Sequence, residues 1–426
     1  MKLLIKNGML IDPANGIEGR YDVLVEDGIV TKVSEYISEE ADELIDAEGK
    51  YVAPGFIDLH VHLREPGYEH KETIKTGALA AAHGGYTTIC AMPNTMPAMD
   101  NVELYKGIVK KCEEEAVVNV LPISAITMNQ GGEYLVNIPE LAQAGVIGFS
   151  EDGKSVMNTA LYKKAMKQVA KEDGLIMAHC EDKNLVGYGV INEGPKSEEL
   201  GLIGISNSVE DIITVRDIIL ATETGCRLHL CHVSTAMSVK YIALAKHDGV
   251  KVTAEVCPHH FTLTDMDIPG DDANYKMNPP LRSKNDVKTL KAALKKGIID
   301  VIATDHAPHH SSEKTQSFKS APFGIVGSET ALALSYTELV KGKVLTLSQL
   351  VEKMSTNPAK IIGIDKGNLA VGKVADIVVF DINEQYEINS DTFKSMGKNT
   401  PFNGRKVYGK VLYTIVNGKV VYDINK

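Results

Sequence analysis

Short apolar runs of strand length recur along the middle of the chain, and segments with helical periodicity lie between them. The predicted strands are Phe56–Leu63, Thr87–Met92, Val118–Ser124, Val146–Phe149, Leu175–His179, Arg227–His232, Val252–Val256 and Ile299–Ala303. The clearest predicted helices are Glu72–His83, Ala160–Lys171, Val209–Thr224, Ala236–His247 and Lys284–Lys296. Eight strands that alternate with helices predict an α/β fold, a (β/α)8 barrel of the TIM type.

The two ends of the chain carry a different pattern, with short alternating runs and hairpin turn signals. Near the start these runs are Leu3–Lys6, Asp22–Glu26 and Ile29–Val33, and near the end they are Ala375–Asp381, Val411–Val416 and Lys419–Tyr422. The N-terminal segment is too small to bury a good core alone and the C-terminal segment offers it a partner, so we expect both to form one small β-sandwich. The expected domains are residues 1–52 and 361–426 in the sandwich and residues 53–360 in the barrel.

The composition is that of a globular protein of 426 residues, with 44% hydrophobic and 24% charged residues. A net charge of −11 argues against a general nucleic-acid binder. No apolar run approaches the roughly 20 residues that a membrane span requires. Six cysteines without a CxxC pair indicate reduced thiols and hence a cytoplasmic location. We therefore expect neither nucleic acid nor membrane among the partners.

Candidate metal ligands stand at the ends of five predicted strands, where barrels place their reactive groups. His60 and His62 are two residues apart, so on a strand they point to the same face. The other candidates follow later strands and are Glu151-Asp152-Gly153, His179, His232 and Asp305. Four histidines and two aspartates suit two divalent metals bridged by a carboxylate and a hydroxide, with Asp305 as general acid and base. This machinery hydrolyses amides, esters or phosphoesters, and the ligands alone leave that choice open.

The run Pro54–His62 (PGFIDLHVH), with His179, His232 and Asp305 at later strand ends, resembles the amidohydrolase superfamily, and four longer motifs resemble the dihydroorotase family within it. They are His60–Gly67 (HVHLREPG), Met92–Thr95 (MPNT), Lys276–Arg282 (KMNPPLR) and Ala303–His310 (ATDHAPHH). The resemblance covers nearly the whole chain. It implies the reversible cyclisation of N-carbamoyl-L-aspartate to L-dihydroorotate in de novo pyrimidine (UMP) biosynthesis, with two Zn²⁺ ions per chain as cofactors.

The resemblance also implies a role for each matching residue. His60, His62 and Asp305 would hold one zinc ion, His179 and His232 the other, and Asp152 would bridge them. The expected substrate-binding residues are Arg64, Asn94 and His309, which would clamp the substrate carboxylate, then Asn278, Phe323 and Gly324, which would contact the ring, and His62. Glu151 and Lys154 remain alternatives for the bridge, and Asp152 is preferred because it directly precedes Gly153, as in the branch of the family with an aspartate bridge.

Two other functions remain in view. The first is an allantoinase or a hydantoinase-type cyclic-amide hydrolase, from which Arg64 would distinguish a dihydroorotase. The second is a non-catalytic dihydroorotase-like scaffold, although such chains lose metal ligands. A homodimer and an association with aspartate carbamoyltransferase are open expectations.

The long loop His306–Gly324 is expected to act as a lid. His83, His229 and His247 are expected to be structural residues without polar partners.

Overall fold

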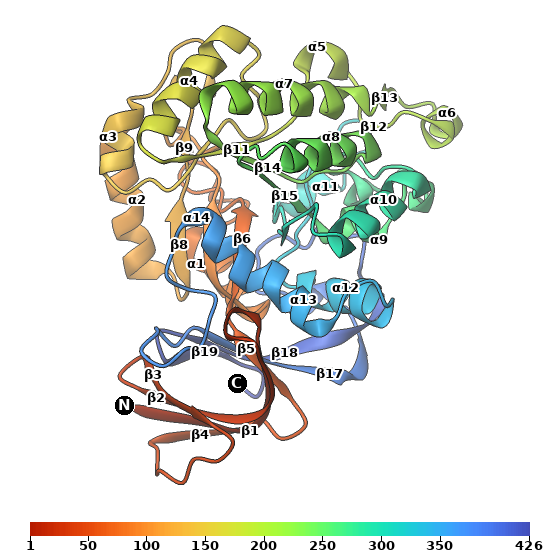
Figure 1. Cartoon of the computed structure of the whole chain (residues 1–426). Coiled ribbons are helices and arrows are strands. Elements are labelled where there is room, and N and C mark those ends of the chain that lie inside the picture. Colours follow the sequence, from red (N-terminus) through yellow and green to blue (C-terminus); the bar gives the residue numbers. More distant parts are fainter.

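A ring of short parallel strands forms the centre of the larger part of the chain in the computed structural model, which describes residues 1–426 (Figure 1). The strands are β6 (Phe56–Val61), β7 (Tyr86–Ala91), β8 (Asn119–Pro122), β9 (Ser124–Ala125), β10 (Phe149–Ser150), β11 (Leu175–Ala178), β14 (Arg227–Leu230), β15 (Val252–Val256) and β16 (Val301–Ile302). They pair in the orders β6-β7-β8 and β9-β10-β11-β14-β15-β16. Only Ile123 separates β8 from β9, so one bent strand joins the two sheets.

The ring closes next to the first strand through isolated contacts. Val61 forms a parallel bridge with His306, and the backbone N–H of His62 donates to the His306 carbonyl at 2.9 Å. With β8 and β9 counted as one strand, eight parallel strands surround the centre, and the predicted (β/α)8 barrel is confirmed.

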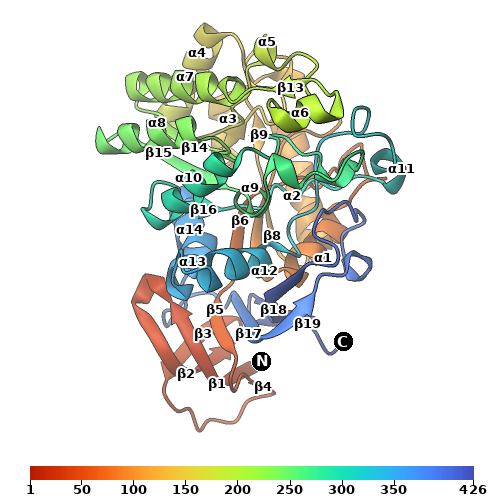
Figure 2. The same cartoon turned by 90° about the vertical axis from the view of Figure 1, so that its right-hand side faces the viewer.

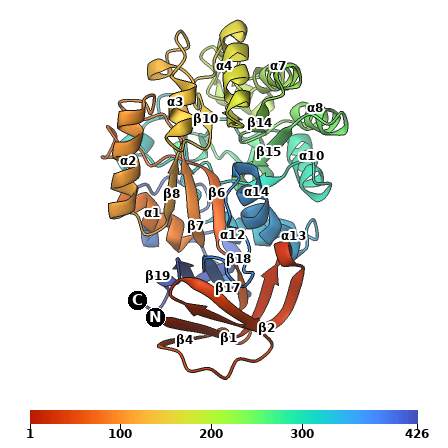
Figure 3. The same cartoon turned by 60° about the vertical axis from the view of Figure 1, so that its left-hand side comes forward.

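Helices cover the outside of the ring, as Figure 3 shows for α1 and α2 beside β6, β7 and β8. The longer ones are α1 (Ile74–His83), α2 (Val102–Glu115), α4 (Thr159–Lys171), α7 (Ser208–Thr224), α8 (Ala236–His247) and α10 (Lys284–Lys295). Most begin after an N-cap residue whose side chain accepts a hydrogen bond from a backbone N–H of the first turn. Thr73 is this residue for α1 and Ser283 for α10. In α4 the buried residues Tyr162, Ala165, Met166 and Val169 follow the helical period, which turns one face to the strands.

Shorter elements complete the barrel and carry several of its loops. They are α3 (Ile138–Gln143), α5 (Lys183–Val186), β12 (Ile191–Asn192), α6 (Pro195–Leu200), β13 (Gly204–Ile205), α9 (Pro258–Thr262), α11 (Ser311–Lys314), α12 (Ala331–Ser335), α13 (Leu347–Val351) and α14 (Asn357–Ile362). None of the helices is both long and apolar enough to cross a bilayer.

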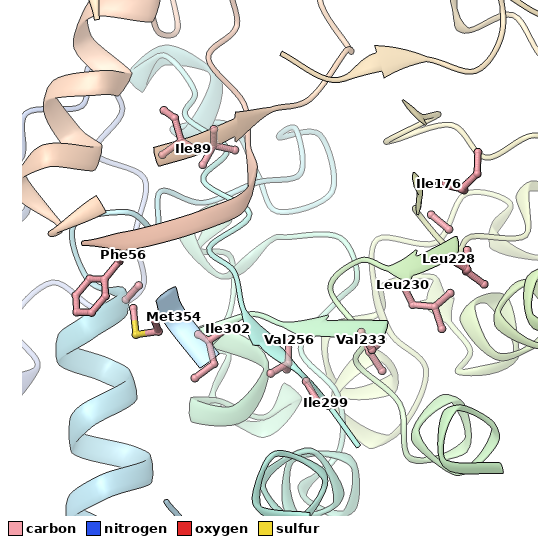
Figure 4. Close-up of a cluster of buried hydrophobic side chains, with 14 of the residues drawn as sticks. Phe56, Ile89, Ile176, Leu228, Leu230, Val233, Val256, Ile299, Ile302 and Met354 are labelled. Carbon is pink, nitrogen blue, oxygen red and sulfur yellow. The ribbon is translucent and has the colours of Figure 1, made fainter. Parts of the chain in front are cut away.

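The layer between strands and helices is the main hydrophobic core, a cluster of 62 buried residues. Figure 4 shows Leu228, Leu230, Val256 and Ile302 of this cluster projecting from their strands. Each such side chain contributes about 1.5–3 kcal/mol when it is fully buried. This layer fixes the strands, and thereby the positions of the residues that follow them.

The two ends of the chain form a second, separate sheet below the barrel (Figure 1). Its strands are β1 (Lys2–Asp12), β2 (Ile17–Glu26), β3 (Ile29–Ser34), β4 (Glu43–Asp46), β5 (Tyr51–Pro54), β17 (Ile377–Glu387), β18 (Lys406–Val416) and β19 (Lys419–Asp423). The order is β19-β18-β17-β5-β1-β2-β3, with β4 on β1. The N- and C-terminal halves meet where β5 pairs antiparallel with β17. Gly55 then separates β5 from the first barrel strand.

This sheet is continuous, but it curls so that its two ends meet, which gives it the sandwich-like form expected. The β2–β3 turn reaches the β18–β19 turn, since a Cβ on Gly28 would lie 2.8 Å from the Asn417 carbonyl. The curl encloses a core of 14 residues that includes Leu3, Val23 and Ile415. Strand β1 extends well beyond the predicted Leu3–Lys6, because an irregularity between Ile5 and Gly8 shifts its register without ending the pairing.

Candidate active site

A cavity of about 180 Å³ opens at the carboxyl ends of the barrel strands. Its lining is mostly polar and consists of His62, Arg64, Asn94, Asp152, Gly153, His179, His232, Asn278, Asp305, Ala307, Phe323 and Gly324. The structure therefore brings nearly all of the predicted site residues to one place. Of the others, His60 lies buried beneath the cavity and His309 beside Arg64.

Asp152 occupies the centre of the histidine cluster. Its Oδ1 lies 3.3 Å from His60 Nε2, 3.5 Å from His179 Nδ1 and 3.8 Å from His232 Nε2. Its other oxygen, Oδ2, lies 3.6 Å from His62 Nε2. One carboxylate thus faces all four histidines, which is the position that a bridging ligand requires.

Asp305 faces the first two histidines from the end of β16. Its Oδ1 lies 3.0 Å from His62 Nε2 and 3.6 Å from His60 Nε2. Burial alone would raise the pKa of Asp305, but the neighbouring His60 and His62 rings hold that pKa below its usual range. The same opposition of burial and His60 holds the pKa of Asp152 well below normal. Both carboxylates are therefore ionised, as metal ligands must be.

Several atoms of this cluster fit a divalent metal better than they fit a hydrogen-bonded core. His60 Nε2, Asp152 Oδ1 and His179 Nε2 are buried and have no hydrogen-bond partner. Buried polar atoms are normally paired, so each unpaired one requires an explanation. Imidazole nitrogen and carboxylate oxygen are common ligands of zinc and similar metals. The donor set therefore fits the metals that the sequence predicts.

Of the three candidates for the bridge, only Asp152 faces the histidines. The Glu151 carboxylate instead accepts hydrogen bonds from the backbone N–H groups of Ile126 and Thr127, both at 3.1 Å. Lys154 is exposed. Both alternatives are consequently placed away from the centre of the cluster.

A buried carboxylate that the sequence interpretation overlooked, Glu255, lies behind the cluster. Its Oε1 lies 2.8 Å from His60 Nδ1, and its Oε2 lies 3.0 Å from His229 Nε2. Despite complete burial, which raises it, the pKa of Glu255 is lowered to about 2 by the two histidines. A carboxylate in this position fixes the orientation of a ligand ring. The charged residue within the apolar run Val252–Val256 was the available signal.

His229 and His83 correct the expectation that they lack polar partners. His229 binds Glu255, and its Nδ1 lies 2.8 Å from Thr253 Oγ1. His83 hydrogen-bonds to Glu329 and its ring packs against Tyr422. Strand β14, which carries His229, pairs with β15, and β15 supplies both partners of His229.

Asp58 is a second buried carboxylate that the sequence interpretation overlooked. It accepts hydrogen bonds from the Thr304 N–H at 3.1 Å and the Thr304 hydroxyl at 2.6 Å. Burial raises the pKa of Asp58 to about 7. These bonds join the first barrel strand to Thr304, the residue that directly precedes Asp305 after the last strand. Few backbone hydrogen bonds connect the first and last strands at this point.

The strand predicted over Phe56–Leu63 would carry its period of two on to Arg64, two residues beyond His62, but Arg64 reaches the cavity by another route. The first strand ends at Val61, two residues earlier than expected, so the strand period does not extend to Arg64. Arg64 instead has a left-handed backbone conformation, with φ at +62°. Two other site residues, His232 and Asp305, also have positive φ values, +35° and +49°. Non-glycine residues in this region are strained and concentrate at functional sites.

The Arg64 head lies beside His309 and keeps donors available. Its Nε donates to the Pro308 carbonyl at 3.1 Å. His309 Nε2 lies 2.8 Å from the Phe323 carbonyl, which can only accept, so this nitrogen carries the proton. The approach of the Arg64 terminal nitrogen to His309 Nε2, 3.4 Å, is then no hydrogen bond. Burial and the Arg64 charge lower the pKa of His309 to about 3, so its ring is neutral.

Asn94 contacts the candidate ligands directly. Its Oδ1 lies 2.9 Å from His62 Nδ1, and its Nδ2 donates to Asp152 Oδ2 at 3.1 Å. On another side of the cavity, Asn278 donates to Glu181. Asn94 thus orients two candidate metal ligands in addition to lining the cavity.

The fold and the site together define a class of protein. A (β/α)8 barrel with four histidines and two aspartates at its carboxyl face, joined to a sheet built from both chain ends, is a metal-dependent hydrolase.

Comparisons with known proteins identify the family. The Dihydro-orotase-like family profile matches residues 49–238, and the Amidohydrolase family profile matches residues 277–422. A dihydroorotase of Acetivibrio thermocellus is 49% identical over 419 residues, 98% of each chain. One of Staphylococcus epidermidis is 48% identical over 425 residues, 99% of this chain and 100% of the relative. The chain belongs to the dihydroorotase family of amidohydrolases.

Solved structures with the same fold carry other names. The L-hydantoinase of Arthrobacter aurescens has a TM-score of 0.87 at 28% identity, over 99% of this chain and 96% of that one. The dihydropyrimidinase of Brevibacillus agri NCHU1002 has a TM-score of 0.88 at 27% identity, over 99% and 95%. Cyclic-amide hydrolases of different specificity thus share this architecture, and the cavity residues must decide between them.

Proposed function

We propose that this chain is a dihydroorotase, which interconverts N-carbamoyl-L-aspartate and L-dihydroorotate in pyrimidine synthesis. Relatives with that name, 48–49% identical over nearly the full length, support the proposal. The observation that carries it is the position of Arg64 in the same cavity as the histidine cluster. Dihydroorotate bears a ring carboxylate that allantoin and simple hydantoins lack. A guanidinium with free terminal N–H groups is the natural partner for that carboxylate.

The proposed cofactors are two zinc ions per chain. His60, His62 and Asp305 would hold one, His179 and His232 the other, and Asp152 would bridge them. Two bound cations would supply Lewis acidity, which lowers the pKa of a water molecule and polarises an amide carbonyl. The complete ligand set argues against the scaffold alternative, since a scaffold has no need of these residues.

The remaining chemistry belongs to the side chains. We assign Asp305 the transfer of a proton from the attacking water to the ring nitrogen that leaves, and the reverse transfer during ring closure. Arg64, Asn94 and His309 would hold the carboxylate. Asn278, Phe323 and Gly324 would contact the ring, and His62, which also lines the cavity, would contact the substrate. Binding the ring in one orientation places its amide carbon near Asp305, which converts a bimolecular encounter into a positioned reaction.

Location and partners belong to the same proposal. The six cysteines are all buried and unbridged, which supports a reducing, cytoplasmic environment. A homodimer and an association with aspartate carbamoyltransferase are to be tested by sedimentation of the purified protein, alone and with that enzyme.

A substrate panel tests the function. We expect kcat/KM for ring opening of L-dihydroorotate to exceed that for hydantoin and for allantoin by orders of magnitude. Higher efficiency on either uncharged ring would assign the chain to the broader class of cyclic-amide hydrolases. Failure to turn over any of the three by a fully metal-loaded protein would favour the scaffold.

A further inference from the structure

The connection between β17 and β18 leaves the small sheet and packs against the mouth of the barrel. Figure 2 shows it rising from the small sheet beside α1. Within it, residues 393–399 alternate between buried and exposed: Phe393, Ser395, Gly397 and Asn399 are buried, and the residues between them are exposed. The buried members of this alternation lie on one surface of the barrel. The surface in this case is the base of the loop His306–Gly324.

Asn399 uses this face to join both ends of that loop. Its side-chain N–H groups donate to the Ala307 carbonyl at 3.1 Å and the Gly324 carbonyl at 3.0 Å. Its side-chain oxygen accepts from the backbone N–H of His309 at 3.1 Å. Its own carbonyl accepts from the Val326 N–H at 2.9 Å. Asn399 as a whole is only 4% exposed, so these bonds are shielded from water.

The four partners of Asn399 lie in two short segments, 307–309 and 324–326. Each segment carries a residue proposed to bind substrate. His309 lies beside Arg64, and Gly324 lines the cavity. The two segments also touch directly, because a Cβ on Gly324 would lie 3.0 Å from His309 Nε2. The amide of Asn399 therefore fixes the distance between two sides of the carboxylate pocket.

Two further contacts hold Asn399 itself in place. The Ser395 hydroxyl and the Met396 N–H both donate to the buried carboxylate of Glu72, near the start of α1. Gly397 allows the segment to approach closely, since a Cβ there would lie 2.7 Å from Pro308 Cβ and 2.8 Å from Asn399 Oδ1. The segment is thus attached to the barrel through Glu72 as well as through the loop that Asn399 binds.

We propose that Asn399, supplied by the small-sheet part of the chain, is a positioning residue that sets the carboxylate pocket of the barrel. The proposal rests on the proposed function. Asn399 does not line the cavity, and it acts through His309 and Gly324. Without its amide, two buried carbonyls lose their donors and the loop must shift to find others. Displacements of about 1 Å in a positioned site lower activity by about 10²-fold.

The test compares Asn399→Ala and Asn399→Asp with wild type on L-dihydroorotate and on its methyl ester, which lacks the carboxylate charge. Asn399→Asp keeps the acceptor for His309 and loses both donors. Asn403→Ala is the matched control, because Asn403 lies in the same connection but is exposed and binds only Ser390. Zinc content and thermal unfolding are measured for every variant.

We expect both Asn399 variants to raise KM for the free acid by about 10²-fold, with a much smaller change in kcat and normal zinc content. The ester should lose far less efficiency, and Asn403→Ala should match wild type. Equal losses on acid and ester, wild-type kinetics, or failure of both variants to fold would each overturn the proposal. An inactive wild type would instead contradict the proposed function, which keeps the two failures distinct.

Discussion

Replacing Arg64 with methionine removes the guanidinium and keeps most of the length and apolar volume of the side chain. In the structure this head is held by the Pro308 carbonyl and lies 3.4 Å from His309 Nε2. Neither contact involves a candidate metal ligand. The substitution should therefore remove the partner of the substrate carboxylate and leave the histidine cluster intact.

The size of the effect follows from the surroundings of the guanidinium. Breaking a buried, charge-assisted pair by removing one partner costs about 3–5 kcal/mol. Arg64 is partly exposed through the cavity, so the lower end, about 3 kcal/mol, applies. Since about 1.4 kcal/mol corresponds to a factor of ten, kcat/KM for L-dihydroorotate should fall about 10²-fold. Arg64→Lys should lose less, because it keeps the charge and loses only the planar fork.

The assay is steady-state ring opening of L-dihydroorotate, with the zinc content of each variant measured in parallel. Arg20→Met is a matched control, because Arg20 is an exposed residue of the small sheet. Near-wild-type efficiency of Arg64→Met would refute the assignment of Arg64 to the carboxylate. A loss of zinc together with activity would show that the residue supports the metal cluster instead.

Three further outcomes follow from the site. Asp152→Ala should lose both zinc and activity while Lys154→Ala keeps both, as metal analysis and turnover will show; full activity of Asp152→Ala would move the bridge elsewhere. Asp305→Asn should lower kcat by about 10²- to 10⁴-fold with a smaller change in KM, and near-normal turnover would remove it from proton transfer. Lys314→Met, which deletes donors to the Pro322 and Gly324 carbonyls, should speed proteolysis of the loop. Saturating dihydroorotate should slow that cleavage in wild type, and equal rates with and without ligand would argue against a lid.

The barrel and the candidate ligands could be predicted because both follow from local patterns. Apolar runs such as Val252–Val256 match their strands residue for residue. The rule that reactive groups follow barrel strands then identifies His179, His232 and Asp305, which follow the ends of their strands by one, two and three residues.

The supporting residues could not be predicted because their partners are distant in sequence. Glu255 binds His60 across 195 positions, and Asn399 binds His309 across 90. The strand period of two also gave the wrong backbone conformation for Arg64. A left-handed conformation, not a strand, turns this side chain into the cavity. Such conformations are set by tertiary packing, so the local sequence does not predict them.

We propose that this chain opens and closes the dihydroorotate ring with metals held by the histidine cluster. The most direct test of this proposal is turnover of L-dihydroorotate by one protein sample as purified, after removal of metal with a chelator, and after addition of zinc. We expect activity with about two zinc ions per chain, loss of activity when the metal is removed, and recovery on addition of zinc. Undiminished turnover by the metal-free protein, or no turnover by the zinc-loaded protein, would contradict the proposal.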